Sequence, residues 1–262
     1  MKRETGPSRH RVDDESGTFF TQAVHAGEER SKPFGSLTMP IVQTSTYVFE
    51  DTAALVEYME RKLHSKETGR GEYGRYGNPT QHTVERKLAK LEGGEAALLC
   101  ASGTGATAST LLTMLSKGKH LILVGDPRPR TRQLCHSVLK RFGVEVSIVP
   151  TNDYQTVEAS VGDNTRLILA EIPTGVHLRV PDIPRLADIA RRRRLKLIVD
   201  STFATPSNLK PLSLGADLVI HDAGAYLAGH NDLLAGAVIG PKGQMINAIQ
   251  DDFARVLVIT HI

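Results

Sequence analysis

Residues 166–206 read RLILAEIPTGVHLRVPDIPRLADIARRRRLKLIVDSTFATP, and they place an amphipathic segment between two short apolar runs. The runs at 166–173 and 195–200 have the length of buried strands, whereas 183–194 carries its apolar residues at helical spacing. Strand, helix and strand in this order are typical of a parallel α/β unit. The stretch therefore indicates an α/β fold.

The same alternation extends in both directions along the chain. Further apolar runs of strand length lie at 96–102, 120–125, 144–150, 216–221 and 233–240. Helices are predicted at 81–92, 102–118 and 131–143, with Gly93–Gly94 ending the first and Gly143 ending the last. Together these segments predict a mostly parallel, doubly wound sheet.

The region before this alternation has a different character. Residues 1–17 are polar throughout and are expected to form a disordered tail. Residues 18–75 have little regular pattern apart from a helical piece at 53–63, and we interpret them as an extended arm. The large domain is then assigned to residues 76–262.

The composition excludes several classes of protein. The 262 residues are 40% apolar and 23% charged, and the net charge of +3 is too small to favour nucleic-acid binding. No apolar run reaches the length of a membrane span, and we expect a cytoplasmic protein. We interpret Cys100 and Cys135 as buried, reduced thiols. The run Arg191–Arg194 is interpreted as the solvated end of a helix. The histidines do not have the spacing of a metal site.

Ligands of doubly wound sheets bind beyond the carboxyl ends of the strands. The residues that follow the predicted strands are Ser102–Gly103, Asp126, 173–175, Asp200 and 221–225. The sequence SGTG at 102–105 opens a helix, and its backbone N–H groups could hold a phosphate, although glycine turns after strands are common. Asp200 could equally cap a turn. These residues define the candidate site.

Several longer pieces together resemble one known family. They are AVHAGEE (23–29), PIVQTSTYVF (40–49), YGRYGNPT (73–80), LEGGEAALLCASG (91–103), TRLILAEIPT (165–174), VDSTFATP (199–206), LGADLVIH (214–221) and YLAGHNDLLAGAVIGP (226–241). They are similar to cystathionine gamma-synthase, cystathionine gamma-lyase, methionine gamma-lyase and O-acylhomoserine sulfhydrylase, enzymes of cysteine and methionine metabolism that use pyridoxal phosphate (PLP).

The resemblance implies an aminotransferase-like large domain of fold type I and a homodimer or a homotetramer built of tight dimers. It also implies elimination or replacement at the beta or gamma carbon of an amino acid, with a lysine that forms a Schiff base with PLP. It further implies a small C-terminal domain carrying an arginine for the substrate carboxylate. The chain stops at Ile262, so we expect that domain to be missing, either because the chain is a fragment or because the domain is lost.

The chain departs from the family where the cofactor is expected to bind. The family pattern is His-Ser-x-Thr-Lys-Tyr, whereas residues 221–226 read HDAGAY. Ala225 replaces the lysine, and Asp222 and Gly224 replace two phosphate ligands. A carboxylate about 4 Å from a phosphate costs ~4 kcal/mol per unit of phosphate charge at an effective dielectric constant near 20. We therefore expect PLP to be unbound, or bound weakly and without a covalent bond.

At other positions of the family pattern, some residues of this chain match and others differ. Thr104 replaces a methionine, Arg128 a tyrosine that stacks on the ring, and Gly175 an asparagine. The positions that match are Gly103, Asp200 for the pyridine nitrogen, and Tyr73 and Arg75 for a neighbouring subunit's phosphate. Because Asp200 and Asp222 should face one cleft, Arg128 is predicted to pair with one of them.

Three functions are compatible with this pattern. The first is a pseudoenzyme that acts as a structural or regulatory partner of an active relative, in a hetero-oligomer. The second is an active PLP lyase or transferase that uses another lysine, of which Lys210 and Lys242 are the nearest along the chain. The third is a module that binds a new small ligand in the emptied pocket. Natural loss and deliberate editing would both leave such a sequence, and neither nucleic acid nor a membrane is expected as a partner.

Overall fold

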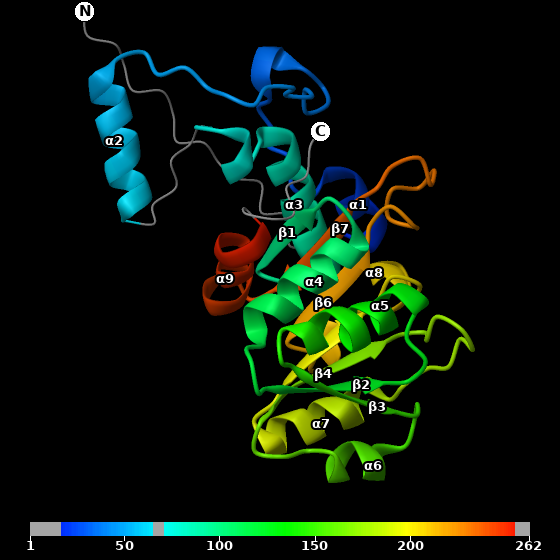
Figure 1. Ribbon diagram of the computed structural model, residues 1–262. Helices are drawn as coiled ribbons and strands as arrows, with labels where there is room; N and C mark the ends of the chain where they lie inside the picture. The colour runs from blue at the N-terminus through cyan, green and yellow to red at the C-terminus, as the bar shows by residue number, and fades with distance from the viewer. Residues whose placement is uncertain (1–16, 65–70, 255–262) are drawn as a thin grey trace, which may run out of the picture.

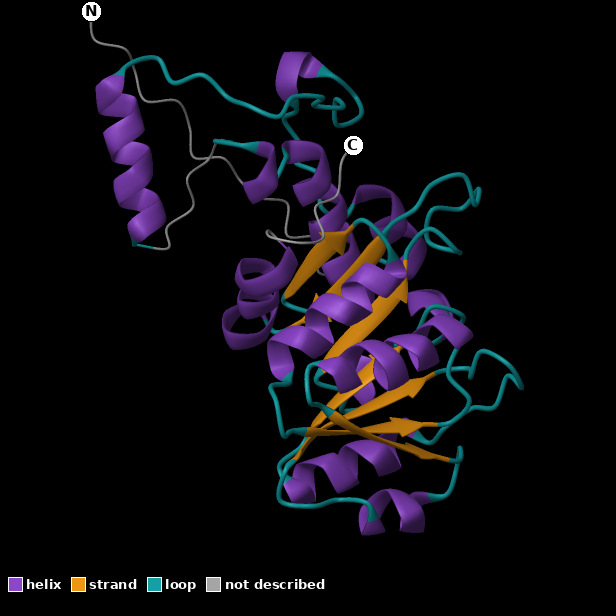
Figure 2. Cartoon of the chain, in the orientation of Figure 1, coloured by secondary structure: helices purple, strands orange, loops and turns teal. Residues whose placement is uncertain are grey.

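The computed structural model describes residues 17–64 and 71–254, so the predicted tail lies almost entirely outside the described residues. A seven-stranded sheet with the order β1-β7-β6-β5-β4-β2-β3 forms its centre (Figures 1 and 2). The strands are β1 (Ala96–Cys100), β2 (His120–Val124), β3 (Glu145–Val149), β4 (Thr165–Glu171), β5 (Lys196–Asp200), β6 (Leu218–Asp222) and β7 (Gly236–Gly240). Each predicted apolar run overlaps one of these strands, and β4 and β6 each extend one residue beyond the run.

The direction of the strands determines where the candidate site lies. Strands β3, β2, β4, β5 and β6 are parallel, whereas β7 runs antiparallel to both β6 and β1. The carboxyl ends of β1 to β6 therefore share one edge of the sheet, and β7 begins at that edge. The mostly parallel sheet was predicted, but the strand order and the reversed direction of β7 were not.

Helices cover both faces of the sheet. The α-helices of the described residues are α1 (Phe19–His25), α2 (Thr52–Leu63), α3 (Pro79–Glu92), α4 (Gly103–Met114), α5 (Pro129–Gln133), α6 (Tyr154–Ala159), α7 (Ile183–Arg193), α8 (Thr205–Asn208) and α9 (Asn247–Ile249), of which α2 does not lie on the sheet. Short 3-10 turns lie at η1 (Pro33–Gly35), η2 (Gly74–Tyr76) and η4 (Pro211–Leu214), and π-helical turns at η3 (Leu134–Leu139), η5 (Lys242–Ile246) and η6 (Gln250–Ala254). The predicted helix at 131–143 is thus divided between α5 and η3.

Alternating side chains along each strand build two apolar cores, one on each face. In β2, Leu121 and Leu123 belong to the core under α4 and η3, whereas Ile122 and Val124 belong to the core under α6 and α7. All four side chains are at most 1% exposed. This two-sided burial explains why the strands read as continuous apolar runs, and it confirms the predicted doubly wound fold.

The N-terminal segment leads away from the sheet. Helix α1, which was not predicted, lies against α3, where Lys87 Nζ donates to the carbonyl of Val24 at 2.8 Å. The Asn78 side chain donates to the carbonyl of Val42 at 2.7 Å. The predicted helix at 53–63 is present as α2, which stands apart from the sheet in Figure 1. None of the helices within 17–64 and 71–254 combines the length and the hydropathy of a membrane span.

Candidate functional site

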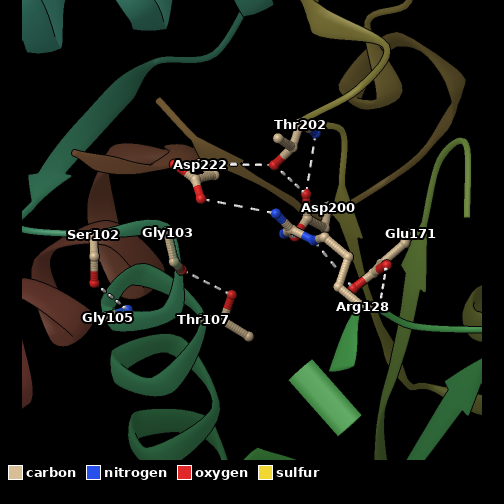
Figure 3. A network of polar contacts seen from close by, with 9 residues as sticks. All are labelled: Ser102, Gly103, Gly105, Thr107, Arg128, Glu171, Asp200, Thr202 and Asp222. Atoms are coloured by element: carbon tan, nitrogen blue, oxygen red, sulfur yellow. Dashed lines mark hydrogen bonds and ion pairs between the residues drawn. The ribbon is translucent and has the colours of Figure 1, made fainter. Parts of the chain in front are cut away.

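Four charged side chains meet at the carboxyl edge of the sheet. Glu171, Asp200 and Asp222 are the last residues of β4, β5 and β6, and Arg128 follows β2 at the start of α5 (Figure 3). Asp200 and Glu171 are buried, with 4% and 2% of their surfaces exposed. The sequence predicted the convergence of Arg128, Asp200 and Asp222, but it did not single out Glu171.

The backbone of Arg128 is fixed by its neighbours. Arg128 stands between Pro127 and Pro129, and its φ of −51° and ψ of 146° lie in the extended region that a following proline favours. Pro129 occupies the first turn of α5, where its missing N–H leaves no bond unmade. The N–H of Arg128 donates to Glu171 Oε2 at 2.8 Å. Pro129 and the bond to Glu171 therefore together hold the backbone from which the Arg128 side chain extends.

The guanidinium of Arg128 contacts all three carboxylates. Its Nη2 donates to Asp200 Oδ2, its Nε lies 3.7 Å from Glu171 Oε1, and its Nη1 lies 3.9 Å from Asp222 Oδ2 (Figure 3). The predicted pairing of Arg128 with Asp200 or Asp222 is confirmed, and the contact with Asp200 is the one that forms a hydrogen bond.

The other oxygen of Asp200 caps the turn that follows β5. Asp200 Oδ1 accepts from the backbone N–H of Thr202 at 3.0 Å and from its hydroxyl at 2.6 Å. Thr202 Oγ1 in turn accepts from the N–H of Asp222 at 2.8 Å. Asp200 therefore combines both roles that its sequence position allowed, since it caps a turn and also pairs with Arg128 at the candidate site.

At Arg128 and at Glu171, burial and the charge of the paired group shift the pKa in opposite directions. Burial would lower the pKa of the Arg128 guanidinium, but the negative charges of Asp200, Glu171 and Asp222 raise it overall. Burial, followed by the charge of Asp200, raises the pKa of Glu171 above its ordinary value, although Arg128 opposes the shift. The guanidinium thus remains charged, and Glu171 is the carboxylate that protonates more readily than usual.

Asp222 lies against the first turn of α4. Ser102 caps this helix by accepting from the N–H of Gly105 at 3.0 Å. A Cβ atom placed on Gly103 would lie 2.6 Å from Cβ of Asp222, so only glycine allows the aspartate to approach this closely. Thr104 is exposed. The helix end expected to receive a phosphate therefore has a carboxylate residue directly beside it (Figure 3).

Two further glycines allow close approaches between separate segments, one beside Arg128 and one in the segment after β6. A Cβ atom on Gly175 would lie 2.5 Å from Cγ of Arg128, and one on Gly224 would lie 2.4 Å from the carbonyl oxygen of Leu233. The N–H of Ala225 donates to the carbonyl of Asp222 at 3.3 Å within a turn. Ala225 places a methyl group where the resemblance implies the lysine.

Tyr73 and Arg75 make their contacts within the arm. Tyr73 bridges to Thr46, and its ring centroid lies 6.4 Å from that of Tyr76. The guanidinium of Arg75 lies 5.7 Å from the ring centroid of Tyr73. The structure therefore holds these two side chains next to each other, in the turn that precedes α3, and Tyr73 is 40% exposed.

The two alternative lysines lie away from the strand ends of the site. Lys242 begins η5 after β7, and because β7 is antiparallel, its carboxyl end lies at the opposite edge of the sheet. Lys210 precedes η4, and its Nζ lies 5.8 Å from the ring centroid of Phe19. Neither lysine joins the Arg128 cluster.

Other predicted features are located as follows. Cys100 and Cys135 are buried as predicted, and burial raises the pKa of each thiol to about 12. Arg191 and Arg192 lie in the last turn of α7, as predicted. Within the described part of the chain, no group of three or more His, Cys, Asp or Glu side chains is arranged so that it could hold a metal ion.

A second buried polar pair, which sequence reasoning missed, lies behind the site. His221 Nε2 and Glu92 Oε1 are 2.5 Å apart, and each side chain is only 1% exposed. The pair joins β6 to the C-terminal turn of α3, and His221 is the neighbour of Asp222. A histidine inside the apolar run of β6 was a possible signal, but no pattern indicated its partner, which is 129 residues away.

Comparisons with known proteins agree with the fold and the motifs. The family model described as Cys/Met metabolism PLP-dependent enzyme matches residues 20–256. Among curated proteins, cystathionine gamma-synthase 1, chloroplastic, of Arabidopsis thaliana is 40% identical over 220 residues, and L-methionine gamma-lyase of Fusobacterium nucleatum subsp. nucleatum is 42% identical over 220 residues. These alignments cover 83% and 84% of this chain but 38% and 54% of the two relatives.

Solved structures give the same result. The crystal structure of metB from Corynebacterium glutamicum superposes with a TM-score of 0.83 at 32% identity, over 93% of this chain and 60% of that one. The cystathionine gamma-lyase from Lactobacillus plantarum, complexed with L-serine, gives a TM-score of 0.80 at 34% identity, over 94% of this chain and 61% of that one. The chain belongs to the Cys/Met metabolism family of PLP-dependent enzymes.

Proposed function

We propose that this chain is a non-catalytic member of its family, which acts as a structural or regulatory subunit beside an active relative. The observation that carries the proposal is Ala225 in the turn after β6, because a methyl group cannot form a Schiff base with PLP. When PLP is bound in this family, its ring serves as the electron sink for the reaction.

The residues at the carboxyl edge do not fit PLP. The Arg128 guanidinium already pairs with Asp200, the partner that the resemblance assigns to the pyridine nitrogen. Asp222 lies against the first turn of α4, where its charge would repel a phosphate. Gly224 and Gly175 offer no side-chain ligand. We accordingly propose that PLP is not held, or only weakly and without a covalent bond.

The partner role is supported by the residues that the chain keeps. The resemblance assigns Tyr73 and Arg75 to a neighbouring subunit's phosphate, and both are present in the arm, with Tyr73 40% exposed. Such residues serve another subunit's cofactor rather than the chain's own. We propose residues 18–75 as the arm of an oligomer interface, 76–262 as residues of the large domain, and a cytoplasmic setting.

Two measurements test the proposal. In a PLP titration of the purified chain, we expect no visible absorbance band of a Schiff base and no lysine labelled after borohydride reduction. A band with a labelled lysine would instead support an active enzyme that uses another lysine.

The second measurement is co-expression with an active relative, such as a cystathionine gamma-synthase or a methionine gamma-lyase. We expect the two chains to co-purify and the PLP affinity or the rate of the active subunit to change. Replacing Arg75 by alanine should remove the change while the chains still co-purify. Failure of both co-purification and rate change would refute the partner role.

A further inference from the structure

Asp200 needs a positive partner in order to remain buried. Its side chain is 4% exposed, and an ionised carboxylate without a counterion at this depth would strongly destabilise the fold. The resemblance assigns this counterion to the cofactor's ring nitrogen. The described structure instead supplies the Nη2 of Arg128.

We infer that Arg128 is a built-in counterion that replaces the positively charged end of the cofactor, so that the pocket folds and remains neutralised without PLP. This inference rests on the proposed function, because it presumes that PLP does not occupy Asp200. It also goes further, since it makes a cofactor-free fold the stable state of this chain rather than a damaged one.

Three independent features support this role for Arg128. Pro129 restricts the backbone of Arg128 to the extended region, which lowers the backbone conformational entropy lost on folding. Its own N–H donates to Glu171, which anchors the residue to β4. Gly175 leaves the space that Cγ of Arg128 occupies. An arginine whose side chain pointed into the site by chance would not require all three features.

The guanidinium also holds four strand ends together. It reaches from the segment after β2 to the last residues of β4, β5 and β6. The ring centroid of Phe203 lies 5.8 Å from its central carbon. In an enzyme that depends on its cofactor, a bound ligand would make such contacts across the edge of the sheet. Here one side chain makes them.

The test is a double-mutant cycle on the full chain, purified without PLP. The variants are Arg128→Met, Asp200→Asn and the double variant, and the measurement is the thermal midpoint. We expect Arg128→Met to lower the midpoint by about 10 °C, because it leaves buried carboxylates unpaired. The double variant should recover more than half of that loss, because it removes the charge that lost its partner.

Arg132→Met is the matched control. Arg132 lies four residues away and forms a 3.7 Å ion pair with Asp126, but it is 49% exposed. Its removal should change the midpoint by less than about 3 °C. A second readout is chemical rescue, since millimolar ethylguanidinium should raise the midpoint of Arg128→Met and leave that of Arg132→Met unchanged.

The inference is overturned if Arg128→Met and Arg132→Met behave alike, or if the double variant is no more stable than Arg128→Met. If Arg128→Met does not fold, Arg128→Lys keeps the charge and should fold with a smaller loss, and its failure to fold would contradict a counterion role. PLP binding by the unchanged chain would instead defeat the proposed function, and the cofactor-free cycle would still decide the role of Arg128.

Discussion

Gly175 lies so close to Arg128 that a Cβ atom at residue 175 would be 2.5 Å from Cγ of the arginine. Two departures from the family pattern are therefore one structural change. The asparagine that the resemblance implies at 175 would collide with Arg128, which lies where the resemblance implies a ring-stacking tyrosine. The arginine can reach Asp200 in this conformation because residue 175 has no side chain.

Gly175→Ala should destabilise the chain by about 1–3 kcal/mol, because the added Cβ forces Arg128 out of its place. In the Arg128→Ala background, the same glycine change should alter the free energy of unfolding very little. Urea unfolding of the unchanged chain, the two single variants and the double variant measures this. Gly162→Ala is the control, since its Cβ would meet no atom closer than 3.4 Å. Equal losses at 162 and 175 would argue against the steric link.

Gly224→Thr, which restores a residue of the family pattern, should also destabilise the chain by about 1–3 kcal/mol. The reason is that its Cβ would lie 2.4 Å from a backbone carbonyl, that of Leu233, which has no rotamer by which to move away. Ala225→Ser is the control at a neighbouring position that already has a Cβ. A stable Gly224→Thr variant would mean that the 229–234 segment moves at little cost.

The stability should depend on pH through Glu171. Burial raises its pKa in the folded chain above the value of about 4.3 for an unfolded glutamate. The folded state therefore binds this proton more tightly, so the free energy of unfolding falls as pH rises from about 4 through the folded pKa, and then levels off. Glu171→Gln should flatten this part of the profile, and urea unfolding at a series of pH values measures it.

Asp153 provides the comparison for that experiment. Hydrogen bonds from Thr156 lower the pKa of its exposed carboxylate. Its contribution has the opposite sign, since stability is lost as pH falls through the lowered pKa. Asp153→Asn should therefore alter only the acidic end of the profile. A profile that Glu171→Gln leaves unchanged would show that Arg128 fully compensates the burial of Glu171.

The buried pair of Glu92 and His221 should behave as a unit. Glu92→Leu alone should cost about 3–5 kcal/mol, because it leaves His221 buried without its partner. The double variant with His221→Leu should cost less than the sum of the two single changes, which denaturant unfolding will show. The exposed pair of His177 and Asp126, 2.7 Å apart, is the control, and Asp126→Leu should cost less than about 1 kcal/mol.

Much of the fold could be predicted because buried parallel strands produce apolar runs that are visible in one sequence. The run at 120–125 is buried on both faces, and that pattern does not depend on which strands lie beside it. The order of the strands and the direction of β7 do depend on neighbours. Helix α1 was missed because its stability comes from α3, through contacts such as Lys87 to Val24, rather than from its own apolar pattern.

The candidate site was predicted in part for a similar physical reason. Residues that end parallel strands must meet at one edge, so the approach of Arg128 to Asp200 and Asp222 followed from topology and charge. The approach of Gly224 to Leu233 and of Gly175 to Arg128 depends on ångström distances between separate segments. No pattern within either segment carries that information.

The position of Gly224 beneath the carbonyl of Leu233 also limits which single substitutions this chain can accept. Because the 229–234 segment packs over a glycine, a threonine at 224 requires that segment to be displaced first. Introducing the residues that the resemblance implies at 224 and 225 would therefore need several substitutions, and the first of them would be harmful on their own. A lysine at 225 needs a change at one residue, but the packing around 224 acts as a barrier to the threonine beside it.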